Sequence, residues 1–354
     1  MRSTIPRTAL LAGAVGVALL AGCSSTPAGG GSSDGGGDQR LTFVTYGSAF
    51  QEAQEKSMVD PFIAETGIDV TVESPVDPAK LKVMVEAGNP TWDVYLAGQQ
   101  DVPAYCGTLF EELDLSNIDE ADFAPGTVEK CGVPVDTYSY MVAYNEEKYG
   151  DNPPTSIADF FDLEKFPGTR SMGSDPAEGN LELALLADGV TPDELYPLDY
   201  DRAFTVLDRV KADTVFWSSG AEQVAIMEEQ RADMILVWSG RGYEAVQNGA
   251  PYAPMWEDNS YHWASLAIVK GSPNREAAQQ FIDFAVSQGP QTVWAESIAY
   301  GPANLTATPK LDAAASAWDS SLQEHRDLSW QIDNAWWGEN QDEVVQRWTD
   351  WSAG

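Results

Sequence analysis

The chain has 354 residues, of which 43% are hydrophobic and 10% aromatic, enough to fill sizeable cores. It carries 55 acidic against 20 basic side chains, a formal net charge of −35. A nucleic-acid partner is not expected, because a phosphate backbone would be repelled. The acidic residues are scattered without long single-sign blocks, which is typical of a solvated acidic surface; steering of a cationic ligand fits the same pattern.

The N-terminus has the features of an export signal. Arg2 and Arg7 precede an apolar segment, residues 9–20, that is too short to span the roughly 30 Å of a bilayer's hydrocarbon. Leu20-Ala21-Gly22-Cys23 then forms the small-residue pattern that lipoprotein processing recognises. We predict a signal peptide over residues 1–22 and a lipid on Cys23, so that the protein is extracytoplasmic and held at the cell membrane. An ordinary secretory signal with a chance cysteine is the alternative.

Residues 23–40 are rich in Gly, Ser and Asp and predict a flexible tether with a reach of roughly 20 Å. Removal of the signal leaves 18 basic against 55 acidic side chains, a charge of −37. About 310 residues follow the tether, more than one hydrophobic core usually serves, which indicates two lobes. No later run reaches the 18 apolar residues of a membrane span.

Two further cysteines, Cys106 and Cys131, form an even pair in an exported and therefore oxidising setting. We expect a disulfide between them. A metal site or a nucleophilic thiol would need partners, and the two histidines, His262 and His325, lie in unrelated places. No metal and no cofactor are expected.

The folded region begins with alternating strands and helices. The pattern predicts strands at 41–46, 68–72 and 92–96 and helices at 52–66 and 78–87. Such a repeat implies a parallel sheet with helices on its faces, and in these sheets ligands collect beyond the carboxyl ends of the strands.

The middle of the chain shows two features that bear on function. The apolar pieces 133–135 and 141–144 flank a polar and aromatic interruption, 136–140, which we interpret as a hinge. Further on, the strand 234–237 runs into the turn 238–242 ahead of a helix, and a helix N-terminus favours an anion.

Short motifs are spread over nearly all of the chain beyond the tether. They include Lys130-Cys131-Gly132-Val133-Pro134, Ala143-Tyr144-Asn145, Lys165-Phe166-Pro167-Gly168 with Arg170, Phe216-Trp217-Ser218-Ser219-Gly220, Trp238-Ser239-Gly240-Arg241 and Tyr300-Gly301-Pro302-Ala303-Asn304. In their number and order they resemble the extracellular solute-binding proteins of ABC importers, in particular the polyamine (spermidine/putrescine) group.

The resemblance implies an α/β, two-lobed periplasmic-binding-protein fold of type II, with the ligand in the interlobe cleft. Lobe one would comprise residues 41–136 and 263–304, and lobe two residues 137–262 and 305–354. It also implies a monomer that hands a small solute to an ABC permease in the membrane and has no catalytic residues. Ligand contacts made only in the closed form would shift the population toward the form that a permease recognises.

An aromatic box with one or two carboxylates would suit an amine, because an aromatic face attracts an ammonium group. The expected ligand-binding residues are Tyr46, Ser48, Tyr138, Ser139, Trp217, Ser219, Trp238, Arg241, Trp256, Asp258, Trp263 and Tyr300. Candidate carboxylates are Asp93, Asp136, Asp175, Glu222 and Asp258. For any single tryptophan the alternative is core packing, and for any single acid it is a solvated surface.

Arg241 points to a different ligand. A guanidinium at a helix N-terminus clamps a carboxylate or phosphonate and repels a plain polyamine, which favours a zwitterion such as γ-aminobutyrate or an aminophosphonate. The alternative is that Arg241 pairs with an acidic residue of the protein. The first expectation for the ligand is a polyamine, and the second is a zwitterion.

Other classes of function are less well supported. An enzyme would need a metal set, a phosphate loop or an activated nucleophile, and the chain has neither H-E-x-x-H nor G-x-x-x-x-G-K. An iron binder would be expected to offer paired tyrosines, but Tyr138 and Tyr140 are not adjacent. A purely structural lipoprotein would lack an indole-lined cleft. A ligand sensor shares every feature described so far.

Overall fold

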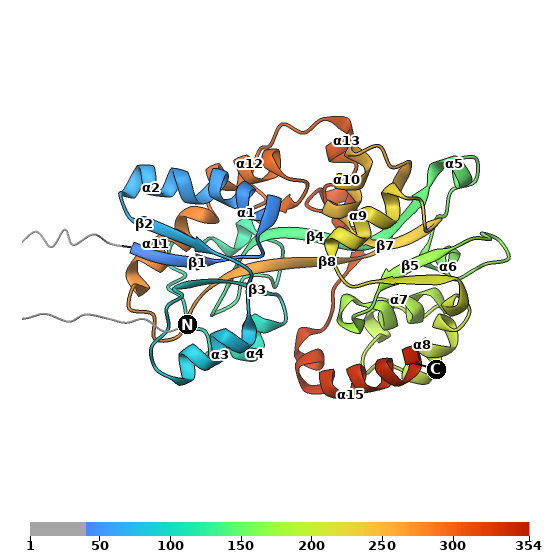
Figure 1. The fold of residues 1–354 in the computed structure, drawn as a ribbon, viewed down its shortest axis with the longest axis horizontal. Helices are drawn as coiled ribbons and strands as arrows, with labels where there is room; N and C mark the ends of the chain where they lie inside the picture. The colour runs from blue at the N-terminus through green and yellow to red at the C-terminus, as the bar shows by residue number, and fades with distance from the viewer. Residues whose placement is uncertain (1–39, 354) are drawn as a thin grey trace, which may run out of the picture. The chain divides into compact units, whose positions relative to one another are not determined.

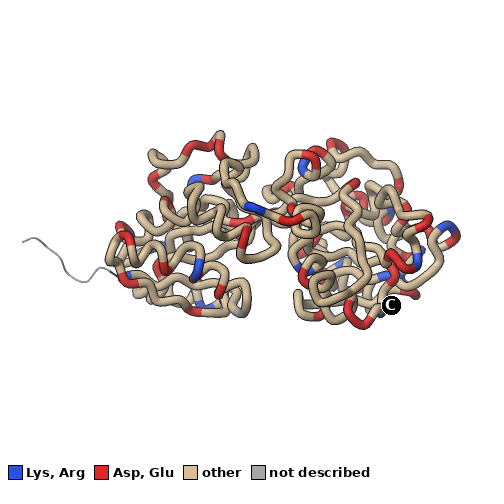
Figure 2. The backbone as a smooth tube through the Cα atoms, turned by 90° about the horizontal axis from the view of Figure 1, so that it is seen from above, with Lys and Arg blue, Asp and Glu red and all other residues tan. Residues whose placement is uncertain are grey.

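The computed structural model describes residues 40–353, so the predicted signal peptide, Cys23 and all of the tether except Arg40 lie outside the described residues. Within residues 40–353 a mixed sheet runs in the order β2-β1-β3-β8-β4-β7-β5-β6, with helices on both sides (Figure 1). No helix among these residues is long and apolar enough to cross a membrane. Figure 2 shows acidic residues spread over both halves of the body, as the sequence predicts.

The first lobe is built on the strands β1, β2 and β3, which are parallel as predicted. Its hydrophobic core collects Phe43, Met58, Phe62, Phe281 and Trp294, all fully buried or nearly so. The elements are β1 (Arg40–Val44), α1 (Ser48–Gln54), α2 (Asp60–Thr66), β2 (Asp69–Glu73), α3 (Pro78–Glu86), β3 (Val94–Gly98), α4 (Asp101–Tyr105), α11 (Arg275–Ala285), α12 (Gln288–Ser297) and β9 (Gly301–Pro302).

The second lobe has a separate core and its own parallel strands, β5 beside β6 and β7. Trp318, Trp330, Trp337 and Trp348 from the C-terminal segment of the chain pack into this core. The elements are α5 (Glu146–Tyr149), α6 (Ile157–Phe160), β5 (Arg170–Gly173), α7 (Asn180–Ala187), α8 (Tyr200–Leu207), β6 (Thr214–Trp217), α9 (Gly220–Glu228), β7 (Met234–Trp238), α10 (Ser239–Gln247), α13 (Ala313–Ser316), α14 (Gln323–Arg326), β10 (Ser329–Trp330) and α15 (Asn334–Ala353).

Two long strands run through both lobes. β4 (Val133–Asn145) and β8 (Tyr252–Ile268) pair antiparallel over most of their length (Figure 1). The predicted interruption at 136–140 is wrong, because these residues continue β4 and pair with residues 260–264 of β8. Polar and aromatic residues stay in the strand there because main-chain hydrogen bonds to β8 do not depend on the side chains.

The predicted disulfide is confirmed. Cys106, which follows α4, is bonded to Cys131, which precedes β4, and their Cα atoms lie 5.5 Å apart. The bond closes a loop of about 25 residues on the first lobe and restricts the unfolded chain.

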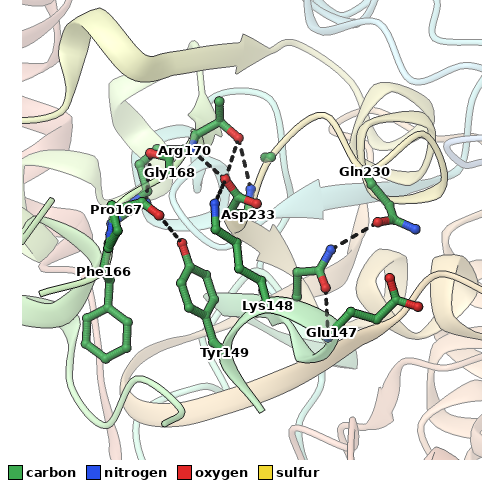
Figure 3. Close-up of polar contacts among 12 residues, drawn as sticks. Glu147, Lys148, Tyr149, Phe166, Pro167, Gly168, Arg170, Gln230 and Asp233 are labelled. Carbon is green, nitrogen blue, oxygen red and sulfur yellow. Dashed lines mark hydrogen bonds and ion pairs between the residues drawn. The ribbon is translucent and has the colours of Figure 1, made fainter. Parts of the chain in front are cut away.

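The motif around Lys165-Phe166-Pro167-Gly168 and Arg170 has a structural role in the second lobe. Arg170 is fully buried and donates to the carbonyl oxygens of Phe160 (2.7 Å), Phe166 (2.6 Å) and Gly168 (3.1 Å). Figure 3 shows it beside the pair of Lys148 and Asp233, whose Nζ and Oδ2 atoms are 2.7 Å apart. The guanidinium therefore satisfies carbonyl groups of the loop that leads into β5.

Arg170→Ala should destabilise the fold by about 3 kcal/mol or more, because three carbonyl groups lose a donor in a buried place. The measurement is the free energy of unfolding in urea. Arg231→Ala is the matched control, since Arg231 makes an exposed pair with Glu229 and should change stability by less than about 0.5 kcal/mol. Equal losses in the two variants would contradict this role of Arg170.

Candidate functional site

The crossing strands place their functional side chains by alternation. Tyr138 lies directly opposite His262, and Asp136 lies opposite Ala264. Since side chains two residues apart share a face of a strand, Asp136 and Tyr138 point to the same side of the sheet. The crossing point of the lobes therefore contributes a carboxylate and a phenol to one surface.

Four rings meet on this surface, and we call them the aromatic cluster: Tyr138, Trp238, His262 and Tyr300. Tyr138 stacks on His262 with ring centroids 5.1 Å apart, and it meets Trp238 at 6.1 Å and Tyr300 at 6.2 Å edge to face. They arrive on β4, the end of β7, β8 and the segment ahead of β9. Three of the four are predicted site residues, brought together from distant segments of the chain.

Tyr46 follows β1 and lies close to this group. Its side chain is 47% exposed, although burial and the nearby carboxylates of Asp136 and Asp101 raise the pKa of its phenol. The Tyr46 side chain therefore has protein groups around it but remains accessible to water, as a residue on the wall of a cleft does. Tyr46 also contacts Phe50 at 5.8 Å, and Phe50 in turn contacts Tyr300 at 5.4 Å.

Asp136 is the carboxylate of the crossing strands. It is 1% exposed, and its Oδ2 atom has no hydrogen-bond partner among the described residues. Burial raises the pKa of this carboxyl to about 8, against the lowering effect of a hydrogen bond from the Ala264 backbone. A cationic group brought against this oxygen would favour its ionised form.

Glu178 is a second carboxylate of the site, and it was missed from the sequence. It follows β5, at the end of a short 3-10 turn (Pro176–Glu178), and its Oε2 accepts from Trp238 Nε1 at 2.7 Å. Burial raises the pKa of Glu178 to about 7, and its charge raises the pKa of Tyr138. Its position after a parallel strand was the only signal, and many acidic residues share that feature.

His262 serves as the floor of the cluster. Gln99 Nε2 lies 3.2 Å from Nδ1, and Ser260 Oγ lies 2.7 Å from Nε2. An amide nitrogen can only donate, so Nδ1 accepts and Nε2 carries the proton. Burial lowers the pKa of His262 to about 3, which keeps the ring neutral behind Tyr138.

Arg241 stands on the other side of Tyr300, in the first turn of α10. The helix begins at Ser239, so the predicted turn 238–242 is largely helical. Two glycines allow the close approach: a Cβ on Gly240 would lie 2.4 Å from the Tyr300 ring, and one on Gly220 would lie 2.6 Å from Arg241 Nε. Burial raises the pKa of Tyr300 to about 12, while the charge of Arg241 lowers it.

The guanidinium of Arg241 is only partly engaged. Its Nη1 donates to Glu244 Oε2 at 2.6 Å, so the pairing considered as the alternative is present. Its Nε has no partner among the described residues, and the side chain stays 23% exposed. A positive group with unpaired donors therefore lies beside the aromatic cluster, in which Glu178 bonds to Trp238 and the charge of Asp136 acts on both Tyr138 and Tyr300.

Three predicted site residues lie on other faces. Ser139 and Trp263 alternate with Tyr138 and His262, so they are buried on the opposite side of the crossing strands. Trp217 is 3% exposed, donates to the Leu236 carbonyl at 2.9 Å and packs behind Trp238.

The remaining predicted residues are not brought into the cluster. Trp256 stacks on His325 at 3.8 Å, and the Asp258 carboxylate accepts from the Ile157 backbone at 3.0 Å. Ser219 caps α9 and is exposed, and Ser48 begins α1. Three of the other candidate carboxylates accept hydrogen bonds near helix or turn N-termini or from the backbone: Asp93, Asp175 and Glu222.

Two cavities accompany the site. One of about 260 Å³ lies between α4 and the start of α15, beside Gln99. A larger hollow of about 420 Å³ runs along residues 302–326, and neither of these two cavities is lined by a predicted ligand-binding residue. No group of three or more His, Cys, Asp or Glu side chains within residues 40–353 is arranged to hold a metal ion.

Two α/β lobes joined by crossing strands, with a cluster of aromatic and charged side chains at the crossing, are the architecture of a two-lobed solute-binding protein. Residues 57–320 match the family model of the bacterial extracellular solute-binding proteins, and the chain belongs to this family. It is the substrate-binding component of an ABC transporter.

Its relatives bind different solutes. It is 34% identical to a γ-aminobutyric acid-binding protein of Pseudomonas aeruginosa over 89% of this chain and 91% of that protein. It is 26% identical to the spermidine/putrescine-binding protein of Escherichia coli over 56% and 59% of the two chains. A solved GABA receptor superimposes with a TM-score of 0.80 at 36% identity, covering 89% of this chain and 98% of that one. The Agrobacterium tumefaciens protein MotA, solved with glucopine, does so with a TM-score of 0.77 at 30% identity, covering 89% and 100%.

Trp238→Ala should weaken binding of the solute by about 1–3 kcal/mol, because it removes an aromatic wall and the donor that holds Glu178. Titration calorimetry would measure the change in affinity, with whichever small amine or zwitterion stabilises the protein in a thermal-shift screen. Trp256→Ala is the matched control, since this indole packs outside the cluster and should leave affinity unchanged. An equal loss of affinity in both variants would show that Trp238 has no specific contact with the solute.

The unliganded protein should lose stability as the pH rises between about pH 5 and pH 8. Asp136 has a raised pKa of about 8, so the folded state binds more protons than the unfolded chain in this window. Deprotonation then costs up to about 1.4 kcal/mol per pH unit for one group. Melting curves of the protein and of Asp136→Asn at several pH values would measure this, and the variant should show a smaller decline. An identical pH dependence would contradict the buried, unpaired state of Asp136.

Proposed function

We propose that this protein captures a small zwitterion with an amine at one end and a carboxylate at the other, of the γ-aminobutyrate class. The observation that carries the proposal is that groups of both charges surround one aromatic cluster. Arg241 lies beside Tyr300, Glu178 accepts a hydrogen bond from Trp238, and the charge of Asp136 acts on both Tyr138 and Tyr300. A ligand of this kind meets an opposite charge at each of its ends.

The energetics of each end support this ligand class. Hydrogen bonds to charged groups contribute about 1.5–3 kcal/mol each when water is excluded. Arg241 would offer its free donors to the carboxylate, and Asp136 Oδ2 would accept from the ammonium. The ammonium would also face the ring of Tyr138 or Trp238, which attracts a cation.

A polyamine, the first expectation from the sequence, is the second candidate. It is favoured by the acidic groups around Tyr46 and Tyr138, namely Asp101, Asp136 and Glu178. It is disfavoured by Arg241, whose charge has only the half-exposed Glu244 as a salt-bridge partner among the described residues. The identity to the γ-aminobutyric acid-binding protein also extends over more of the chain than that to the polyamine binder named above.

The working cycle we propose is lobe closure without catalysis. The lobes would be residues 41–136 with 263–304 and residues 137–262 with 305–354, and they would close on the solute at the crossing strands. A monomer held outside the membrane by the lipid on Cys23 would then deliver it to an ABC permease. The raised pKa values of Asp136 and Glu178 mean that an ammonium ligand would displace protons when it binds.

The test is a thermal-shift panel on residues 40–354, with γ-aminobutyrate, aminoethylphosphonate, putrescine, spermidine and neutral controls. A true ligand at 100 times its Kd should stabilise the protein by about 2.7 kcal/mol. We expect stabilisation by γ-aminobutyrate and no effect of putrescine. Stabilisation by polyamines alone would contradict the proposal that the ligand is a zwitterion.

Arg241→Gln should weaken γ-aminobutyrate by about 10- to 150-fold, or about 1.5–3 kcal/mol, since it removes the charge opposite the carboxylate. The Kd of each variant is measured by titration calorimetry. Arg275→Gln is the control, because Arg275 pairs with Glu111 on the surface of the first lobe. If Arg241→Gln binds γ-aminobutyrate with unchanged affinity, Arg241 pairs with Glu244 and does not bind the ligand.

A further inference from the structure

The hollow of about 420 Å³ lies behind the crossing strands, on the face that does not carry Tyr138. Asp319 and Ser321 line it, and between them Ser320 Oγ lies 3.1 Å from Thr137 Oγ1. Thr137 directly precedes Tyr138 on β4, so the two side chains point to opposite faces of the strand. The hollow therefore shares no lining residue with the aromatic cluster.

The walls of this hollow are held in place by both lobes. They come from residues 302–311 and 316–326, and Figure 1 shows the chain between α12 and α13 running from the first lobe to the second. The backbone of Lys310 donates to Glu296 Oε1 of α12 at 2.9 Å. Trp256 of β8 donates through Nε1 to the carbonyl oxygen of Ala317 at 2.9 Å. The hollow is thus built into the fold by contacts that need no ligand.

Two side chains of opposite charge, Arg326 and Asp319, line the hollow, and neither forms an ion pair with any described residue. Arg326 Nη2 donates to the neutral amide of Gln323 at 2.7 Å, and its Nη1 makes no hydrogen bond within residues 40–353. Asp319 is 7% exposed, and its Oδ1 accepts from the backbone and the hydroxyl of Ser321 at 2.8 and 2.7 Å. Its Oδ2 accepts from no described group.

The two charges lie close to one another without meeting. Burial raises the pKa of Tyr261 to about 12, and among the weaker effects the charge of Arg326 lowers this pKa while that of Asp319 raises it. Both groups are therefore within electrostatic reach of one phenol. Most arginines among residues 40–353 do pair with a carboxylate. A ligand that lies between Arg326 and Asp319 would give each of them a partner.

The rest of the wall is largely apolar. Three leucines face the hollow and are only partly buried, so an apolar group placed among them would remove further surface from water. The volume falls within the roughly 300–1,000 Å³ of sites that hold small molecules. The hollow thus combines one cation, one anion and apolar surface; its apolar lining residues are Pro302, Leu305, Ala307, Pro309, Leu311 and Leu322.

We propose that this hollow is a second binding site, which takes a small α-amino acid with an apolar side chain, of the leucine class. Arg326 binds the carboxylate through its planar fork of N–H donors, and Asp319 Oδ2 accepts from the ammonium group. The leucines of the wall surround the side chain of the ligand. Neither Arg241 nor the aromatic cluster takes part, so the inference does not rest on the proposed function.

The test measures the binding of L-leucine to the protein by titration calorimetry, beside two analogues that each lack one charged group. These are 4-methylpentanoate, without the ammonium, and 3-methylbutylamine, without the carboxylate. We expect leucine to bind and each analogue to bind about tenfold or more weakly, because each leaves one charged group of the hollow unpaired. Glycine, which has no apolar side chain, should also bind more weakly than leucine.

Arg326→Gln should weaken leucine about tenfold or more. Lys310→Gln is the matched control, because it removes a positive charge from the same segment at an exposed position outside the hollow, and it should leave the affinity unchanged. Asp319→Asn keeps the oxygen that accepts from Ser321 and should abolish the preference for leucine over 4-methylpentanoate.

Arg241→Gln separates the two sites, and leucine should bind to this variant as tightly as to the unchanged protein. No binding of leucine, or the same affinity in Arg326→Gln, would overturn the second site. Loss of leucine in Arg241→Gln with full binding in Arg326→Gln would also overturn it and would place leucine at the aromatic cluster. Failure of γ-aminobutyrate to bind would contradict the proposed function alone.

Discussion

The antiparallel pairing of β4 with β8 is the constraint on which the rest of the structure depends. Each strand starts in one hydrophobic core and ends in the other, so their main-chain hydrogen bonds hold the two lobes together. On one face of the paired strands, the side chains at the crossing do not belong to the core of a single lobe. Asp136, Tyr138 and His262 occupy that face, where we propose that the solute contacts both lobes.

Desolvation gives this surface its character. Asp136 and Glu178 are held where water is scarce, and the pKa of each is raised well above that of a free carboxyl. Such groups are costly to ionise without a cation and strongly favoured to ionise with one. Arg241, which is always ionised, lies beside Tyr300 and pairs with Glu244. Arg241 therefore carries its charge before any solute arrives, whereas Asp136 ionises when a cation binds, and together they favour a ligand with one anionic and one cationic group.

Some of the short motifs named in the sequence analysis have structural roles, and others contribute side chains to the aromatic cluster. Their spacing in the sequence does not separate the two kinds. Arg170 and Arg241 both sit in such motifs. Arg170 is fully buried and satisfies three carbonyl groups, whereas Arg241 keeps donors free beside the cleft. The tryptophans behave likewise: Trp217 fills a core and Trp238 forms a wall of the site. Burial of the individual side chain decides its role, and burial depends on contacts between distant segments.

By itself the sequence indicated the local strand and helix order through its periodicity, the two lobes through its length, and the disulfide through an even cysteine pair in an exported chain. The class of protein followed from the resemblance of its motifs, in their number and order, to a known family. The sequence also indicated Tyr138, Trp238, Arg241 and Tyr300, which lie at strand ends or in motifs. Only the tertiary structure decided that β4 runs unbroken through residues 136–140, that Ser139 and Trp263 face away from Tyr138 and His262, and that Glu178 bonds to Trp238. The physical reason is that strand register, and with it the face of every side chain, is set by pairing between segments more than a hundred residues apart.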